Sequence, residues 1–118
     1  MSYDIELQDP ITHDVLELDK PHFMRGGMYA INGTTELHLN VTYNYCEIFH
    51  KVLGDKGIRS IYGKTGAQSI SILEKAISNL KDDVSTDYWE STEGNAKRAL
   101  TQLKAMAEMR PDGVWSGD

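Results

Sequence analysis

The sequence predicts an α+β fold in which two N-terminal β-hairpins form an antiparallel sheet and three C-terminal amphipathic helices pack against it. Two observations support this prediction. Apolar and polar side chains alternate along the first third of the chain, which is the period of a half-buried strand. From residue 44 onward, apolar side chains recur at helical spacing, and residues typical of helix caps precede the apolar stripes.

The first predicted hairpin covers residues 3–18. Apolar and polar residues alternate over 3–8, and Asp9-Pro10 then breaks the pattern. An extended pattern resumes at Val15, so a turn is expected over residues 9–14. Pro21 closes the hairpin.

The second predicted hairpin joins residues 28–31 to residues 34–43 through Asn32-Gly33, a dipeptide that accepts the positive φ angles of a type I′ turn. Every second residue from Leu37 to Tyr43 is apolar, and the residues between them are polar. The polar face of this strand is therefore either exposed to solvent or a recognition surface.

The first predicted helix begins at Asn44, whose side chain can cap the first turn, with Glu47 at the reciprocal position of a capping box. An apolar stripe follows from Tyr45 to Leu53, and Gly54 supplies the C-terminal cap. Thr65 begins the second helix as part of another capping box, ahead of a second apolar stripe.

The third helix is expected to begin near Thr92 and to stop at Arg110-Pro111. The residues that follow should form a loose tail unless Trp115 packs back onto the body. The expected organisation is therefore one domain over residues 1–118, with hairpins over 3–43, three helices over 44–109 and a tail over 110–118.

Net charge restricts the expected partners. The chain carries a net charge of −6, with 18 acidic residues against 12 Lys and Arg. Direct binding to long nucleic acid is not expected, because phosphate neutralisation needs a dense basic face. The balance suits a protein that docks on a basic surface of a partner.

Cysteine usage and hydropathy restrict the expected compartment. Cys46 is the only cysteine, so no intrachain disulfide can form and a reducing compartment is expected. The N-terminus lacks the features of a signal peptide, and no apolar run approaches the roughly 20 residues of a membrane span. A cytoplasmic protein without a membrane segment is therefore expected.

Gly63-Lys64-Thr65 is similar to the end of a phosphate-binding P-loop, but five residues separate it from Gly57 where the motif requires four. No strand precedes it, so a Walker A site is excluded. A helix start still offers N–H groups and a positive dipole end to an anion, and Arg59 adds charge. Alternatively, these residues only form the loop and the cap of the second helix.

Residues 22–27 form a second candidate binding loop, which combines the imidazole of His22, the guanidinium of Arg25 and two glycines. Alternatively, this loop is a crossover between hairpins, in which Phe23 and Met24 cover the sheet edge.

Cys46 and His50 form the only local pair at metal-ligand spacing, and a zinc site would need two further ligands, with His22 or His38 as candidates. Alternatively, Cys46 is a small semi-buried residue and His50 a surface residue. No metal or other cofactor is predicted.

No catalytic residue is predicted either, because no Ser lies in a Gly-x-Ser-x-Gly elbow and the cysteine has no evident partner.

Five segments carry a resemblance: 40–45 (NVTYNY), 57–66 (GIRSIYGKTG), 87–90 (DYWE), 93–96 (EGNA) and 109–115 (MRPDGVW). The chain resembles small proteins of unassigned activity carried by bacteriophages and prophages, over most of residues 25–118. The resemblance carries over no functional residue. It implies a context in which short phage-type proteins bind a host component, including inhibitors of bacterial defence systems.

Two functional hypotheses follow. The first is a non-enzymatic accessory protein that binds a host or phage macromolecule stoichiometrically, with antagonism of bacterial defence as one such role. The second is a binder of a small phosphorylated ligand or nucleotide at the Gly63–Thr65 helix start. A homodimer formed through strand edges or the third helix is also open. The residues predicted to hold a small ligand are Arg25, His50, Arg59, Tyr62, Lys64 and Thr65.

Overall fold

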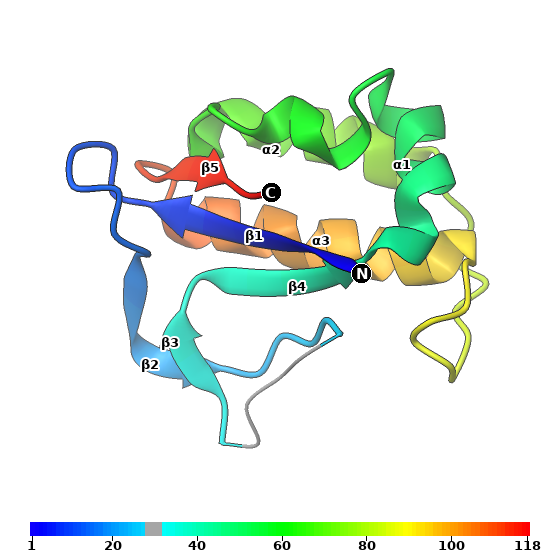
Figure 1. The fold of residues 1–118 in the computed structure, drawn as a ribbon, viewed down its shortest axis with the longest axis horizontal. Helices are drawn as coiled ribbons and strands as arrows, with labels where there is room; N and C mark the ends of the chain where they lie inside the picture. Colours follow the sequence, from blue (N-terminus) through cyan, green and yellow to red (C-terminus); the bar gives the residue numbers. More distant parts are fainter. Residues whose placement is uncertain (28–31) are drawn as a thin grey trace.

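The computed structural model describes residues 1–27 and 32–118, and it confirms an α+β fold with antiparallel sheets and three α-helices in this part of the chain (Figure 1). None of these helices has the length and apolar character that a membrane crossing requires. In chain order the elements are β1 (Ser2–Gln8), β2 (Glu17–His22), β3 (Thr34–Glu36), β4 (His38–Thr42), a 3-10 helix (Tyr43–Tyr45), α1 (Cys46–Leu53), a second 3-10 helix (Gly57–Ile61), α2 (Gly66–Ser78), α3 (Glu93–Met109) and β5 (Val114–Ser116).

β1 is the central strand of a three-stranded antiparallel sheet with the order β4-β1-β5. Its alternation predicts which face is buried, and Tyr3, Ile5 and Leu7 are indeed in the core. Their register partners are also buried, and they are Val41, Leu39 and Trp115 respectively.

The first hairpin prediction is wrong in its strand pairing, although a turn is present at residues 9–14. The Asp9 N–H donates to the Asp14 carbonyl at 2.8 Å. Beyond an isolated bridge between Gln8 and Val15, however, the chain leaves β1, and β2 pairs with β3 in a separate two-stranded sheet. Both edges of β1 are taken by β4 and β5, which bring buried apolar side chains, whereas most residues of β2 are exposed.

The second hairpin differs from its prediction as well, and its first predicted strand, residues 28–31, lies outside the described residues. The predicted strand over 34–43 is divided into β3 and β4, which belong to different sheets. Buried Leu37 lies between them. Its N–H donates to the Leu16 carbonyl at 2.9 Å, and its carbonyl accepts from the Leu7 N–H at 3.0 Å. The backbone of Leu37 therefore joins the two sheets.

The starts of α2 and α3 agree with the predicted caps. Thr65 Oγ1 accepts the Gln68 N–H at 3.1 Å, and Gln68 Oε1 accepts the Thr65 N–H at 3.0 Å, which completes a capping box. At α3, Thr92 Oγ1 accepts the Asn95 N–H at 3.0 Å.

α1 begins at Cys46, one residue later than a cap at Asn44 allows. Thr42 Oγ1 accepts the Asn44 N–H at 3.1 Å, so Thr42 caps a 3-10 turn before α1 starts at Cys46. The Asn44 side chain donates instead to the Trp89 carbonyl at 2.8 Å. The predicted end is correct, since Gly54 follows the helix with a φ of 94°.

The C-terminal tail follows the second of the two predicted alternatives, because Trp115 packs back onto the body as part of strand β5. Trp115 is 1% exposed, and its indole N–H donates to Ser69 Oγ at 2.7 Å. Its backbone bonds to both Gly63 and Lys64. Burial of a large aromatic side chain outweighs the entropy that a short terminal segment loses when it becomes ordered.

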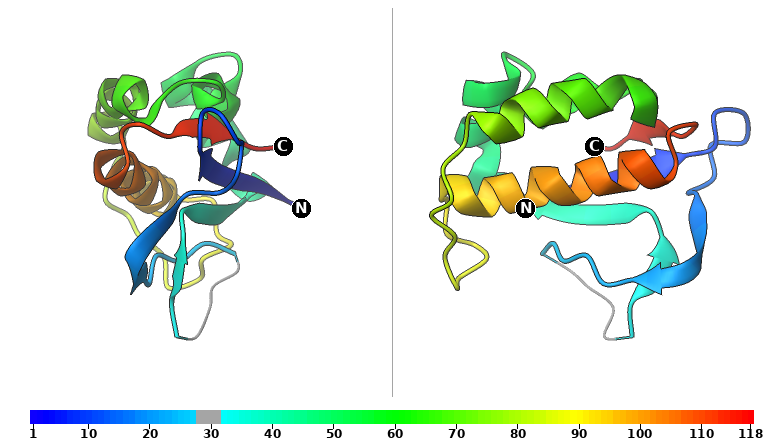
Figure 2. Two further views of the ribbon diagram at one scale, coloured as in Figure 1. Left: turned by 90° about the vertical axis from the view of Figure 1, so that its left-hand side faces the viewer. Right: turned by 180° about the vertical axis from the view of Figure 1, so that it is seen from behind.

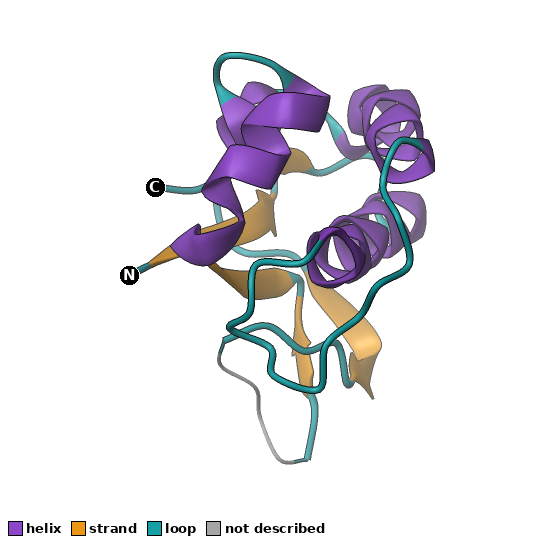
Figure 3. Cartoon of the chain, turned by 90° about the vertical axis from the view of Figure 1, so that its right-hand side faces the viewer, coloured by secondary structure: helices purple, strands orange, loops and turns teal. Residues whose placement is uncertain are grey.

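α2 and α3 lie side by side and cover one face of the central sheet (Figure 2). The loop between them, residues 79–92, passes around the start of α3 and approaches β4 (Figure 3). The chain segment that follows β2 also reaches β4, where the Gly27 N–H donates to the Asn40 carbonyl at 2.8 Å. Two loops that are distant in sequence thus meet beside α3.

Candidate functional site

The structure does not bring the six predicted ligand residues into one site. The cleft that contains Arg25 is lined by none of the other five. His50 lies on α1, where its Nδ1 is 3.2 Å from the Gly54 carbonyl oxygen. Arg59 donates from Nε to the Asp118 carbonyl oxygen at 2.9 Å, and its guanidinium lies 5.1 Å from the centre of the Tyr3 ring.

The predicted anion site at the start of α2 has its backbone donors occupied by the chain itself. The Gly66 N–H donates to the Gly113 carbonyl at 2.8 Å, and the Ala67 N–H donates to the Pro111 carbonyl at 3.1 Å. The next N–H is used in the capping box. Thr65 is therefore a capping residue, and the segment before β5 takes the position in which an anion would bind. Lys64 contributes its backbone to the bond with Trp115.

Tyr62 packs near β5, away from the Arg25 cleft. Its hydroxyl is buried and has no hydrogen-bond partner among the described residues. Burial raises the pKa of Tyr62 to about 12, so this side chain is a neutral phenol at physiological pH. In the described part of the chain, no three His, Cys, Asp or Glu side chains gather as a metal site would require.

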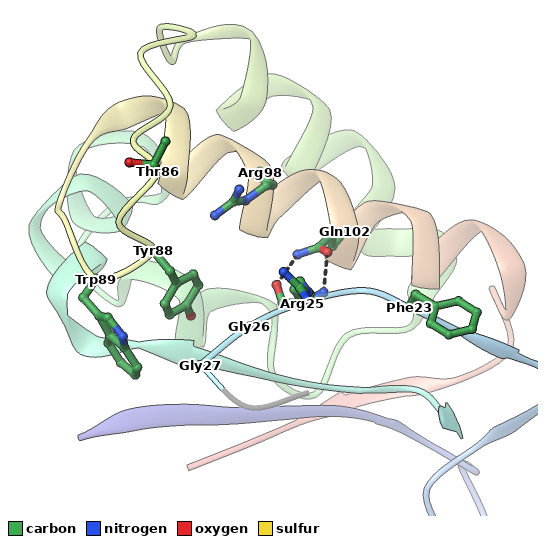
Figure 4. Close-up of a pocket in the computed structure, with 9 residues that line it drawn as sticks. All are labelled: Phe23, Arg25, Gly26, Gly27, Thr86, Tyr88, Trp89, Arg98 and Gln102. Carbon is green, nitrogen blue, oxygen red and sulfur yellow. Dashed lines mark hydrogen bonds between the residues drawn. The ribbon is translucent and has the colours of Figure 1, made fainter. Parts of the chain in front are cut away.

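A cleft of about 390 Å³ lies beside α3, between the two loops that meet at β4 (Figure 4). We call it the Arg25–Trp89 cleft. Arg98 and Gln102 come from α3, and the remaining residues come from the loops on either side. Its lining residues are Phe23, Arg25, Gly26, Gly27, Thr86, Tyr88, Trp89, Arg98 and Gln102.

Gln102 fixes the first loop of the cleft. Its Oε1 accepts the Arg25 N–H at 2.8 Å, and its Nε2 donates to the Arg25 carbonyl at 2.8 Å, so one side chain satisfies both backbone groups. Gly26 lies so close to β4 that a Cβ there would stand 1.7 Å from the Asn40 carbonyl oxygen. This position accepts only glycine without a shift of the loop.

Asn95 fixes the second loop. It is 1% exposed on α3, and its Nδ2 donates to the Asp87 carbonyl at 3.0 Å and to the Glu90 carbonyl at 2.9 Å. Its Oδ1 accepts the Ser85 N–H at 2.9 Å. The Tyr45 hydroxyl also donates to the Tyr88 carbonyl. The side chains of Asn95 and Tyr45 therefore hold the backbone on both sides of Trp89 by hydrogen bonds.

Replacement of Asn95 by aspartate should release this loop, because the carboxylate keeps the acceptor for Ser85 but loses both donors. We expect the free energy of unfolding to fall by about 1 to 3 kcal/mol. Amide hydrogen exchange over residues 85–90 should accelerate. As a matched control, Asn32→Asp makes the same chemical change in an exposed turn and should leave both quantities unchanged. Equal behaviour of the two variants would contradict this role of Asn95.

Tyr88 covers the outer edge of β4. Its hydroxyl accepts the Thr42 N–H at 3.0 Å and lies 3.3 Å from the Asn40 carbonyl oxygen, to which it can donate. Burial raises the pKa of Tyr88, although the hydrogen bond from the Thr42 N–H and the nearby charge of Arg98 oppose the shift, so the hydroxyl keeps its proton near neutral pH. Asn40 and Thr42 are buried, so this part of the polar strand face is not open to solvent, whereas His38 on the same face is half-buried.

An aromatic series supports Trp89 at the mouth of the cleft. The rings of Trp89 and Tyr88 are 5.0 Å apart, and those of Tyr88 and Tyr45 are 5.7 Å apart, both in edge-on geometry. Phe49 continues the series into the core at 6.0 Å from Tyr45. Trp89 remains 50% exposed and Phe23 69% exposed, so two apolar side chains project beside the cleft.

Glu93 ties the start of α3 to α1 and to the first residues of the loop over 79–92, and it makes stability depend on pH. Its carboxylate accepts the Lys81 N–H at 3.1 Å and lies 3.1 Å from Lys51 Nζ, and these two contacts lower the pKa of Glu93. A lowered carboxyl pKa stabilises the folded state above the unfolded pKa of about 4, and this contribution is lost as pH falls through the folded value.

We therefore expect Glu93→Gln to reduce stability at pH 6 and to have less effect at pH 3, when measured by urea unfolding. Glu108→Gln, an exposed change near the end of α3, serves as the control at both pH values. A Glu93→Gln effect of the same size at both pH values would contradict the assignment.

Sequence reasoning missed Arg98, Gln102 and Asn95 as contributors to this site. In the sequence they are ordinary polar residues of a helix. No neighbouring residue indicates that they lie beside residues 25 and 85–90. Tyr88 and Trp89 carried the one available signal, which is an aromatic pair in an otherwise polar loop.

Comparisons of the chain with protein-family models, with curated proteins and with solved structures give no match. The functional proposal therefore rests on the geometry of the Arg25–Trp89 cleft.

Proposed function

We propose that this protein acts by stoichiometric binding to a macromolecular partner and that the Arg25–Trp89 cleft is the contact surface. The observation that carries the proposal is the placement of two exposed aromatic side chains, Phe23 and Trp89, around two arginines, on loops that side chains of α3 hold by hydrogen bonds. The sequence resembles small phage proteins, and for such a protein the partner would be a host or phage macromolecule. Antagonism of a bacterial defence system is one role of this kind.

The composition of the cleft supports binding. Trp, Tyr and Arg are the residue types that most often dominate the energy of protein interfaces. Because the backbone of Arg25 is held by Gln102 and that of the Trp89 loop by Asn95, little ordering entropy remains to be lost when a partner binds.

The second candidate function is binding of a small anionic ligand. The Arg25–Trp89 cleft is a better site for such a ligand than the start of α2. Its volume of about 390 Å³ lies in the range of small-molecule sites, and Arg25 and Arg98 both line it. A thermal-shift series with ADP and inorganic phosphate tests this candidate. A ligand at 100 times its dissociation constant should add about 2.7 kcal/mol of stability, and no shift with either compound would count against it.

Site-specific photo-crosslinking tests the main proposal. Benzoylphenylalanine in place of Trp89 should give a discrete covalent adduct of defined mass in bacterial cells that express the protein. The same photo-reactive residue in place of Ile11, which is 87% exposed and does not line the cleft, should not give that adduct. No adduct at Trp89, or the same adducts at both positions, would refute the proposal.

A further inference from the structure

We propose that the Arg25–Trp89 cleft binds a short acidic segment of a protein partner, in which carboxylates alternate with apolar side chains. This inference rests on the proposed function and adds the chemistry of the partner. It follows from the shape of the cleft, its charges and the apolar side chains around it.

The shape favours an extended occupant. A second, more open hollow of about 290 Å³ lies along α3, and Arg98 and Gln102 line both hollows. On the far side of these residues it is bordered by Val84, Lys97 and Thr101. Because the two hollows share Arg98 and Gln102, they lie next to each other along α3, and the pair suits a chain segment better than one compact molecule.

The charges favour carboxylates. Arg98 is exposed, and its guanidinium donates no hydrogen bond to any described residue. Arg25 lines the same cleft from the opposite loop (Figure 4). Among the described residues that line the two hollows, the one carboxylate is Asp82, which is already paired with Lys97 at 2.7 Å. Guanidinium groups bind carboxylates in a bidentate geometry, so this surface complements an acidic side chain.

The apolar side chains favour an alternating segment. Trp89 is 50% exposed beside the first hollow, and Val84 is 55% exposed beside the second. An extended segment places successive side chains on opposite sides, so apolar residues between the acids could contact Trp89 and Val84.

Phosphate-bearing ligands fit this surface less well. The first backbone donors of α3 are used internally, since the Gly94 N–H donates to Asp83 Oδ1 at 3.0 Å and the Asn95 N–H donates to Thr92 Oγ1 at 3.0 Å. The net charge of −6 opposes the approach of a long polyanion. A short acidic segment avoids most of this repulsion.

Fluorescence titration of the intact protein tests the inference. The two tryptophans differ, because Trp115 is buried and Trp89 lies at the cleft, so a change in emission reports on Trp89. The probe is a peptide of alternating Glu and Leu, about eight residues long, which spans about 26 Å when extended. This length is shorter than the two longer of the molecular dimensions, which are 36 × 31 × 23 Å. The controls are the Gln-for-Glu peptide, ADP and inorganic phosphate.

We expect saturable binding of the Glu-containing peptide, weakened about tenfold or more by Arg98→Glu and by loss of the carboxylates. Lys56→Glu, which makes the same charge change outside the cleft, should bind as the natural protein does. Equal binding of the Gln-containing peptide, or a response only to ADP or phosphate, would overturn the inference. If the Trp89 cross-link forms but the acidic peptide neither binds nor competes with it, the inference fails while the proposed function stands. Absence of the cross-link refutes the proposed function itself.

Discussion

Replacement of Trp115 by alanine is expected to lower the free energy of unfolding by about 3 to 5 kcal/mol, the largest stability effect of any single change considered for this protein. The indole is 1% exposed. Trp115 pairs with Leu7 of β1, and its backbone bonds to Gly63 and Lys64 just before α2. Truncation would leave a cavity between the sheet and α2, and Ser69 Oγ would lose the donor that now lies 2.7 Å away. Urea unfolding measures the change.

Two further variants keep this prediction testable if the alanine variant does not fold. Trp115→Phe retains most of the ring but no indole N–H, so its loss should be smaller than that of alanine. Ser116→Ala lies in the same strand and should change stability by less than about 0.5 kcal/mol. A loss below about 1 kcal/mol for Trp115→Ala would contradict the role of β5 in the core.

Replacement of Arg98 by glutamate is expected to abolish capture of the partner by the Trp89 photo-crosslinking probe. The change reverses a charge at the junction of the two hollows, where an acidic segment would be repelled. Because Arg98 is exposed and its guanidinium donates no hydrogen bond within the described residues, the fold should survive the change. Adduct yield, compared with the same protein carrying only the probe, is the measurement.

The control for Arg98→Glu is Lys56→Glu, which lowers net charge equally but lies before the second 3-10 helix, away from the cleft. Urea unfolding of both variants separates a binding defect from a folding defect. Undiminished adduct with Arg98→Glu would argue against recognition of an acidic segment at Arg98. Equal loss with Lys56→Glu would argue against a specific role of the cleft.

The helices were largely predictable because their signals are local. Thr65 with Gln68 and Thr92 with Asn95 are caps that act over three residues, and the apolar stripes that follow have helical spacing. The strand partners were not predictable from turns alone. β1 pairs with β4 and with β5, which lies more than a hundred residues away in sequence, and the choice depends on which strand buries the most apolar surface.

The candidate site was predicted only in part. Arg25 and its glycine-containing loop, predicted as a candidate binding loop, line the Arg25–Trp89 cleft, and their role in binding stays a prediction. Lys64 and Thr65 were assigned to an anion site whose backbone donors bond instead to Pro111 and Gly113. Arg98 could not be found from sequence, because an arginine on the polar stripe of a helix is ordinary until loops from elsewhere in the chain meet beside it.

The most direct test of the central claim is amide hydrogen exchange of the protein in complex with the partner captured through Trp89. We expect new protection over residues 23–27, 85–90 and 97–102, which border the cleft, and the same protection to be absent with Arg98→Glu. Protection concentrated at residues 63–66 or on the pair β2–β3, with the cleft unchanged, would show that the partner binds elsewhere.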